Sequence, residues 1–200
     1  MIKVFASSNK HKIAEVKEIL KDDEIVTLAD VGFVGDIDET GTTFLENALI
    51  KARTISEFLK EKGLDYPVLA DDSGLCVEAL NGQPGVYSAR YAGSHGDNEA
   101  NRQKLLAALR DTGNKKAYFQ SVIVEYYPDG SYIFGDGRTY GHITERKIGN
   151  ESFCYDCLFF SDDLKKTFGE ATPDEKNQVS HRYRAMMALQ KNSNSTVTKK

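Results

Sequence analysis

The sequence is poor in the residues from which disulfide-rich and zinc-binding domains are built. It has no tryptophan, four histidines, four prolines and three cysteines in 200 residues. Three cysteines are too few for a disulfide framework. Cys154 and Cys157 form one CxxC pair, without the second pair or nearby histidine that a closed zinc site needs. We therefore interpret the cysteines as reduced and structural, with a redox role for the CxxC pair as the weaker alternative.

Long apolar runs are also absent. No stretch is long enough to span a membrane, and the polar and basic residues 7–12 interrupt the apolar start in a way that a signal peptide does not. We expect a cytoplasmic protein with no membrane partner. The formal net charge of −4 argues against nonspecific binding to nucleic acid, so no nucleic-acid partner is expected either. A small anionic ligand held by a local positive cluster remains compatible with this charge.

Hydrophobic periodicity predicts strands and helices in alternation. The predicted strands lie at 2–6, 68–70, 117–127, 132–134, within 138–148 and at 158–160; the predicted helices begin near Lys10 and cover 44–60, 99–110 and 181–190. This mixture favours an α/β fold with a central mixed β-sheet flanked by helices. The length fits one domain over residues 1–190, either an ordinary globular domain or one with two lobes, and we expect the polar residues 191–200 to form a disordered tail.

The first segment suited to chemistry is Ser7-Ser8-Asn9-Lys10-His11-Lys12, between a predicted strand and a predicted helix. Small residues let the backbone approach a ligand, and the N–H groups at the start of a helix favour an anion such as phosphate. The alternative is a helix cap, in which Ser8 or Asn9 accepts the first N–H groups and the lysines are solvated.

Two acidic segments come next. Asp71-Asp72-Ser73-Gly74 follows an apolar strand, and Asp36, Asp38 and Glu39 precede the predicted helix 44–60. Adjacent carboxylates suit Mg²⁺, which binds one or two carboxylates together with phosphate oxygens and water. A carboxylate that does not bind the metal would accept a proton from attacking water. The alternatives are an Asp-rich turn ended by glycine and a solvated acidic loop.

The fourth segment combines Lys176 with Ser180-His181-Arg182. Arginine offers forked donors to phosphate and lysine a point charge, while His181 would hydrogen-bond the edge of a base. The alternative is an ordinary helix start with Ser180 as its N-cap. The sequence has neither the GxSxG elbow of a serine hydrolase nor the HExxH spacing of a zinc protease.

Several longer motifs in one order are more specific than any one of these segments. Residues 5–12 resemble the (A)TGNxxK motif of the Ham1/RdgB-like inosine triphosphate pyrophosphatases, 40–48 their ETGxTFxENA segment, 69–75 their ADDSGL, 82–91 their GxPGxYSARY, and Lys176 with 180–182 their closing K…SHR. The resemblance runs from about Ile2 to Leu189.

The resemblance implies an elongated α/β fold with two lobes around an active-site cleft, usually assembled as a homodimer. It implies Mg²⁺-dependent attack of water between the α- and β-phosphates of ITP, dITP or XTP, which yields the monophosphate and pyrophosphate. Asp72 would be the catalytic proton acceptor and a metal ligand, with Asp38 or Glu39 as a further metal ligand. The residues that would contact the purine nucleoside triphosphate are Ser7, Ser8, Asn9, Lys10, His11, Lys12, Ser73, Phe153, Cys154, Tyr155, Asp156, Lys176, His181 and Arg182.

The stretch 149–157 departs from the family pattern GxGGFGYDP. Phe153, Tyr155 and Asp156 are retained, whereas Glu151, Ser152 and Cys154 replace glycines and Cys157 replaces the proline. Because glycine-only backbone angles are lost there, we hypothesise an altered base preference or weaker activity. Two alternatives stay open: a related pyrophosphatase for another base, as in the Maf-like proteins, and a nucleotide-binding protein without turnover.

Overall fold

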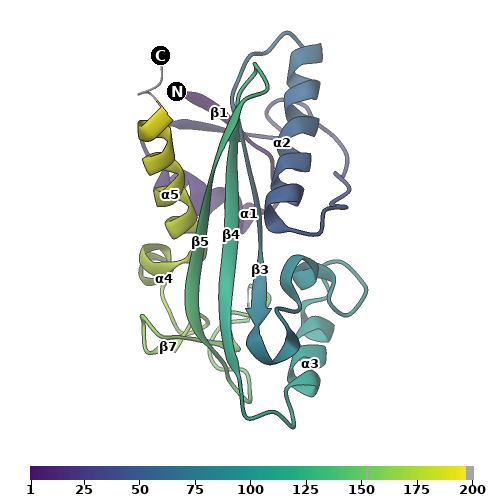
Figure 1. Cartoon of the computed structure of the whole chain (residues 1–200), viewed down its shortest axis with the longest axis vertical. Helices are drawn as coiled ribbons and strands as arrows, with labels where there is room; N and C mark the ends of the chain where they lie inside the picture. The colour runs from purple at the N-terminus through teal and green to yellow at the C-terminus, as the bar shows by residue number, and fades with distance from the viewer. Residues whose placement is uncertain (152, 197–200) are drawn as a thin grey trace. The chain divides into compact units, whose positions relative to one another are not determined.

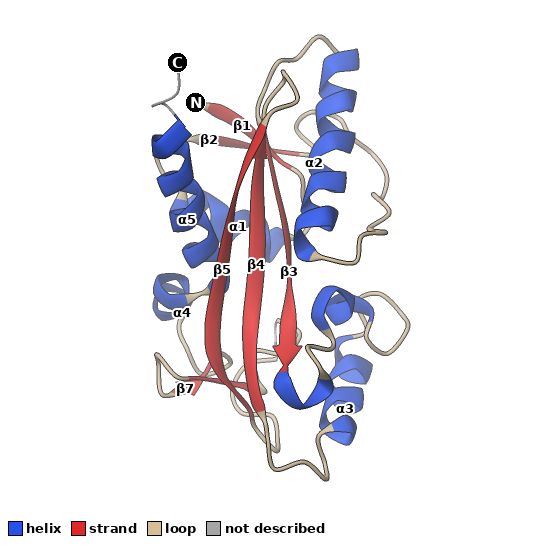
Figure 2. Ribbon diagram, viewed as in Figure 1, coloured by secondary structure: helices blue, strands red, loops and turns tan. Residues whose placement is uncertain are grey.

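The computed structural model describes residues 1–151 and 153–196 and contains a seven-stranded mixed sheet with helices packed on it (Figures 1 and 2). The strand order is β2 (Glu24–Thr27), β1 (Ile2–Phe5), β3 (Val68–Val77), β4 (Lys116–Tyr126), β5 (Tyr132–Ile143), β6 (Phe159–Ser161) and β7 (Lys166–Thr167). β1 pairs in parallel with β2 and β3, whereas β6 pairs antiparallel with β5 and β7. The predicted α/β fold with a mixed sheet is therefore confirmed.

The helices are α1 (Lys10–Ile19), α2 (Phe44–Glu61), α3 (Asn98–Ala108), α4 (Pro173–Val179) and α5 (His181–Thr196), with short 3₁₀ helices η1 (Glu78–Leu80) and η2 (Gly85–Arg90). Capping explains where the longest one begins. The Thr43 side chain accepts from the backbone N–H of Glu46, whose carboxylate accepts from the Thr43 N–H, so the two residues form a capping box. Among the described residues, no helix has the length and apolar character needed to cross a membrane.

The chain divides into two compact units. Unit 1 comprises Met1–Asp72, Ser121–Gly137 and Arg182–Lys200, and unit 2 comprises Ser73–Gln120 and Arg138–His181. In unit 1, successive side chains of β1 and β3 point to opposite faces of the sheet, which separates the core into two layers. Val4, Ala6, Val68 and Ala70 pack with the apolar face of α2, while Phe5 and Leu69 pack with α1 and α5. Figure 1 shows α2 and α5 on opposite sides of these strands.

The core of unit 2 is rich in aromatic rings. Phe119 of β4 lies with its ring centroid 4.8 Å from that of Phe159, and Phe159 lies 5.1 Å from Phe168. The other buried members of this core are Leu75, Val77, Leu105, Leu109, Ala117, Ile143, Tyr155, Cys157 and Leu158. Residues of the stretch 149–157 thus belong to the packed interior of unit 2.

Three expectations from the sequence are corrected. The strand that starts at Val68 does not end at Asp71 but continues to Val77. Gly74 permits this because a Cβ at that position would lie 2.2 Å from the Gly85 carbonyl oxygen, so only glycine fits beneath the η2 segment. The segments 132–134 and 138–148 are not separate strands, since β5 runs unbroken from Tyr132 to Ile143.

The third correction concerns the predicted tail. Residues 191–196 continue α5, and the Asn192 side chain donates to the Phe134 carbonyl oxygen at 2.8 Å. Residues 197–200, for which disorder was also predicted, lie outside the described residues. Ser180 is the C-cap of α4 and directly precedes α5.

Candidate active site

The start of α1 is capped by the side chain of Asn9. The Asn9 Oδ1 atom accepts from the backbone N–H groups of His11 (3.0 Å) and Lys12 (3.3 Å), and the Asn9 N–H donates to Ser7 Oγ (3.2 Å). The capping interpretation is therefore correct for Asn9. Ser8, Lys10 and His11 are exposed at this turn. The predicted phosphate-binding role of 7–12 stays a prediction.

Lys12 and Arg182, both predicted to contact substrate, are joined in unit 1 by Asp71. Lys12 Nζ lies 3.1 Å from Asp71 Oδ2, and Arg182 donates to the same oxygen through Nε and Nη2, each at 3.2 Å. Arg182 is 1% exposed and also pairs with Glu15. Burial by itself would raise the pKa of Asp71, but the charges of Lys12 and Arg182 outweigh it and hold that pKa well below its usual range.

Asp72 points to the other side of β3 and meets residues of α2. Asn47 Nδ2 donates to Asp72 Oδ2 at 2.9 Å, and Lys51 Nζ lies 3.8 Å from Asp72 Oδ1 and 3.0 Å from Glu39 Oε1. Burial, with a smaller contribution from the charge of Glu39, outweighs the opposing charges of Lys51 and Lys12 and raises the pKa of Asp72 to about 6. Asp72 is thus a buried carboxyl that titrates close to neutral pH, as a general base requires.

Asn47 and Lys51 were not among the site residues predicted from the sequence. They are four residues apart on α2, and both are buried on its otherwise apolar inner face. The Asn47 Oδ1 atom accepts from Gly41 N–H at 2.8 Å, so one amide ties the loop before α2 to Asp72. The signal in the sequence was a pair of polar residues, four positions apart, among the apolar residues of a predicted helix.

Glu39 and Asp72 suit a divalent cation. Both lie at the ammonium group of Lys51, so the two carboxylates are close to the same point on α2. Asp38 is exposed, which favours Glu39 over Asp38 as the partner of Asp72. Within the described part of the chain, no group of three or more His, Cys, Asp or Glu side chains is placed to hold a metal ion. Two carboxylates are the set with which Mg²⁺ binds when phosphates and water complete its shell.

In unit 2, the stretch 149–157 approaches α4. Lys176 makes a close ion pair with Asp156, and its Nζ lies 4.6 Å from the centroid of the Phe153 ring. The Lys176–Asp156–Phe153 cluster therefore brings together three of the predicted substrate contacts. Ser73, another of them, is half-buried at the unit 2 end of β3.

Tyr155 and His181, both predicted to contact the substrate, are buried and not at the surface. Tyr155 is 2% exposed, and its hydroxyl donates to the Ser88 carbonyl oxygen at 2.8 Å. His181 is also buried, with its ring stacked on Phe119 at 5.0 Å between centroids. We conclude that the Tyr155 side chain is part of the core of unit 2, where its hydroxyl satisfies a backbone carbonyl.

The thiols of the CxxC pair lie in an environment that disfavours the thiolate form. Burial raises the pKa of Cys154 to about 11 and also raises that of Cys157. Both thiols are thus protonated at neutral pH, and none of Cys76, Cys154 and Cys157 forms a disulfide. This favours the structural interpretation of the cysteines over a redox role.

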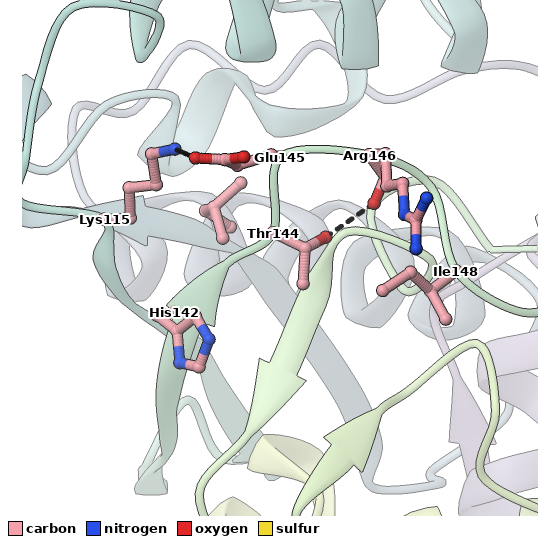
Figure 3. A pocket seen from close by; sticks show the side chains of 7 residues that line it. Lys115, His142, Thr144, Glu145, Arg146 and Ile148 are labelled. Atoms are coloured by element: carbon pink, nitrogen blue, oxygen red, sulfur yellow. Dashed lines mark hydrogen bonds and ion pairs between the residues drawn. The ribbon is translucent and has the colours of Figure 1, made fainter.

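Unit 2 also has an open surface hollow, shown in Figure 3, that contains none of the predicted site residues. It is lined by Lys115, His142, Ile143, Thr144, Glu145, Arg146 and Ile148. Lys115 is paired with Glu145 at 2.9 Å, and the Thr144 hydroxyl donates to the Arg146 carbonyl oxygen. The hollow does not contain the carboxylates or the aromatic residues that carry the proposed chemistry.

Comparison with solved structures and curated proteins shows which proteins this chain resembles. The Staphylococcus aureus Ham1 protein is 39% identical with a TM-score of 0.85, over 98% of this chain and 100% of that one. A Mycobacterium abscessus structure described as a nucleoside-triphosphatase, dITP/XTP pyrophosphatase, is 43% identical with a TM-score of 0.75, over 94% and 98%. A dITP/XTP pyrophosphatase of Clostridium perfringens is 49% identical over 94% of this chain and 95% of its own length.

A family model, the Ham1 family, matches residues 3–192. The chain belongs to the Ham1 family.

Proposed function

We propose that this protein hydrolyses non-standard purine nucleoside triphosphates, dITP, XTP and ITP, to the monophosphate and pyrophosphate. The observation that carries the proposal is the pair of carboxylates, Asp72 and Glu39, held around Lys51 in a chain whose relatives are named dITP/XTP pyrophosphatases. Such an enzyme removes these nucleotides from the pool. Cleavage of a phosphoanhydride is largely positioning and charge neutralisation, which these residues are suited to provide.

Asp72 is the group that would take the proton from water. With a pKa of about 6, it is mostly ionised at pH 7 and still basic enough to accept a proton. Asn47 orients its carboxylate by donating to Oδ2. Glu39 and Asp72 would hold Mg²⁺, which when bound neutralises phosphate charge. Lys10 and Lys12 at the start of α1 supply positive charge for the phosphates.

The base would be recognised in unit 2. Phe153 offers an aromatic face, and Asp156 and Lys176 offer an acceptor and a donor beside it. A site that hydrogen-bonds a 6-oxo group leaves a polar atom unpaired when a 6-amino group enters, which costs about 1–3 kcal/mol. This is the discrimination against adenine nucleotides that the proposal requires.

We further infer a homodimer in the cytoplasm, where the proposed substrates belong to the nucleotide pool. In unit 1, β5 exposes Tyr132 and Phe134, two residues apart on one strand and each with 40% of its surface accessible, and we take this pair as the candidate contact between the copies. Sedimentation of the native chain and of Phe134→Glu tests this. A native dimer that dissociates in the variant supports the inference, and a native monomer refutes it.

Pyrophosphate release from dITP with Mg²⁺ tests the activity, with Asp72→Asn against the native chain. We expect a loss of roughly 10²-fold or more, because a general base alone contributes at least that factor. Asp38→Asn is the matched control, since Asp38 is exposed and near Glu39 in the chain. A native chain that binds dITP without releasing pyrophosphate would support the alternative of a binding protein. Faster hydrolysis of a modified pyrimidine nucleotide would support a Maf-like specificity.

A further inference from the structure

Backbone hydrogen bonds connect both ends of the stretch 149–157 to Gly169. The Asn150 N–H donates to the Gly169 carbonyl oxygen at 2.7 Å, and the Gly169 N–H donates to the Asp156 carbonyl oxygen at 2.9 Å. Gly149 has φ +85°, and a Cβ there would lie 2.3 Å from the Gly169 carbonyl carbon. This glycine, unlike the replaced ones, is required by both its conformation and its packing.

The middle of the stretch is held by a side chain of α3. Arg102 Nη1 donates to the Cys154 carbonyl oxygen at 2.8 Å, and Arg102 Nη2 lies 3.2 Å from Glu151 Oε2. The same Nη2 lies 2.8 Å from Glu99 Oε2, and the Arg102 side chain is 6% exposed. Because a guanidinium presents planar, forked donors, Arg102 can bind the helix and the loop at once.

A second cation completes the cluster. Lys147 Nζ lies 3.0 Å from Glu151 Oε2 and 3.3 Å from Glu99 Oε2. The four side chains therefore carry two positive and two negative charges, and each glutamate contacts both cations. A network of this kind contributes more than an isolated surface pair. Without Glu151, the two cations would share only Glu99, and the loop would lose its ionic contacts to both of them.

We propose that Glu151 is a positioning residue, which acts through Arg102 and Lys147 to hold the loop that carries Phe153 and Asp156 in its nucleotide-binding position. The proposal rests on the proposed function, which assigns Phe153 and Asp156 to the base. The family pattern that this stretch resembles, GxGGFGYDP, has glycine where this chain has Glu151. In this chain the ion pairs of Glu151 with Arg102 and Lys147, here called the clamp, restrain the loop at this position. Because salt screens ion pairs, nucleotide affinity should depend on the ionic strength.

The test compares KM and kcat for dITP in Glu151→Gln and the native chain, at about 0.05 M and about 0.5 M KCl. We expect KM to rise about two- to fivefold at low salt with little change in kcat, and the ratio to approach one at high salt. Glu145→Gln is the matched control, since it removes one charge from the exposed Lys115–Glu145 pair of the same unit. Equal melting temperatures confirm that each variant is folded.

Opposite results would overturn the proposal. A lower KM in Glu151→Gln would mean that Glu151 only repels the anionic nucleotide, and an unchanged KM at both salt concentrations would mean that the clamp positions nothing. A rise in KM of equal size in Glu145→Gln would mean that the effect comes from the net charge of the protein and not from the clamp.

A second variant, Arg102→Lys, keeps the positive charge and removes the paired donors of the guanidinium group. We expect KM to rise more in Arg102→Lys than in Glu151→Gln. In the variant that carries both substitutions, the fold-increase in KM should be smaller than the product of the two single fold-increases, because Glu151 acts in part through Arg102. Fully multiplicative effects would argue against the clamp. If the native chain releases no pyrophosphate, the proposed function fails. The clamp is then tested by the Kd for dITP, with the same salt-dependent ratio expected.

Discussion

Asp71 and Asp72 are consecutive residues of β3, yet their carboxylates meet different cations on opposite sides of the strand. Asp71 accepts from Arg182 and lies 3.1 Å from Lys12 Nζ, whereas Asp72 lies 3.8 Å from Lys51 Nζ. The pKa of Asp71 is thereby lowered, and that of Asp72 is raised to about 6. Under the proposed function, Asp71 is the permanent anion of this pair and Asp72 is the proton acceptor.

The activity should depend on the ionisation of Asp72. We expect kcat/KM for dITP to rise with pH through an apparent pKa near 6, because only the carboxylate accepts a proton. Lys51 lowers the pKa of Asp72, so Lys51→Met should move this acidic limb to higher pH. Pyrophosphate release between about pH 5 and pH 9 measures it. An acidic limb at the same pH in both proteins would show that Lys51 does not control the titration of Asp72.

Asp71 should stabilise the fold above its unfolded pKa. Its pKa is lower in the folded state, so its contribution is present above about pH 4 and is lost as the pH falls below that value. Asp71→Asn should lower the free energy of unfolding at pH 7 by about 3 kcal/mol, because Arg182 is left buried with Glu15 as its carboxylate partner. Urea unfolding at several pH values tests both statements. A variant as stable as the native chain at pH 7 would contradict them.

Glu39 should contribute to magnesium affinity. Glu39→Gln removes one of the two carboxylates at Lys51, and we expect the Mg²⁺ concentration for half-maximal activity to rise about tenfold, with much of kcat recovered at saturating metal. Asp38→Asn serves as the control, because Asp38 is exposed. Titration of activity with MgCl₂ measures the change. A rise in Asp38→Asn instead would assign the metal to the other acid.

Tyr155 should matter for stability and not for nucleotide affinity. Tyr155→Phe removes the hydroxyl that donates to the Ser88 carbonyl oxygen, so the free energy of unfolding should fall by about 1 kcal/mol. KM for dITP should stay within a factor of about two, because the side chain is packed in the core of unit 2. Thermal melting and steady-state kinetics separate the two effects. A stable variant with a much higher KM would place the hydroxyl at the nucleotide instead.

Features that depend on neighbouring residues in the chain were predictable. The position of α1 followed from a polar turn ahead of an apolar helical pattern, and Asn9 does cap that helix. The periodicity of α2 predicted its extent, since the predicted helix 44–60 differs from the observed one by a single residue. The family was likewise recognisable, because the order of its motifs is a property of the sequence.

Other features depended on contacts between residues far apart in the chain. Asp71-Asp72-Ser73-Gly74 has the composition of a turn, but the η2 segment packs against Gly74 and the strand continues. The ion pair between Lys51 of α2 and Glu39 was likewise not readable from the sequence, and it is the reason why the proposed function prefers Glu39 to Asp38. The sequence by itself determined the family and the main helices and strands, since these are encoded in local patterns, but β2, β7 and α4 were not predicted. Only the tertiary structure decided which carboxyl is a permanent anion and which titrates near neutrality, because burial and distant cations set those pKa values.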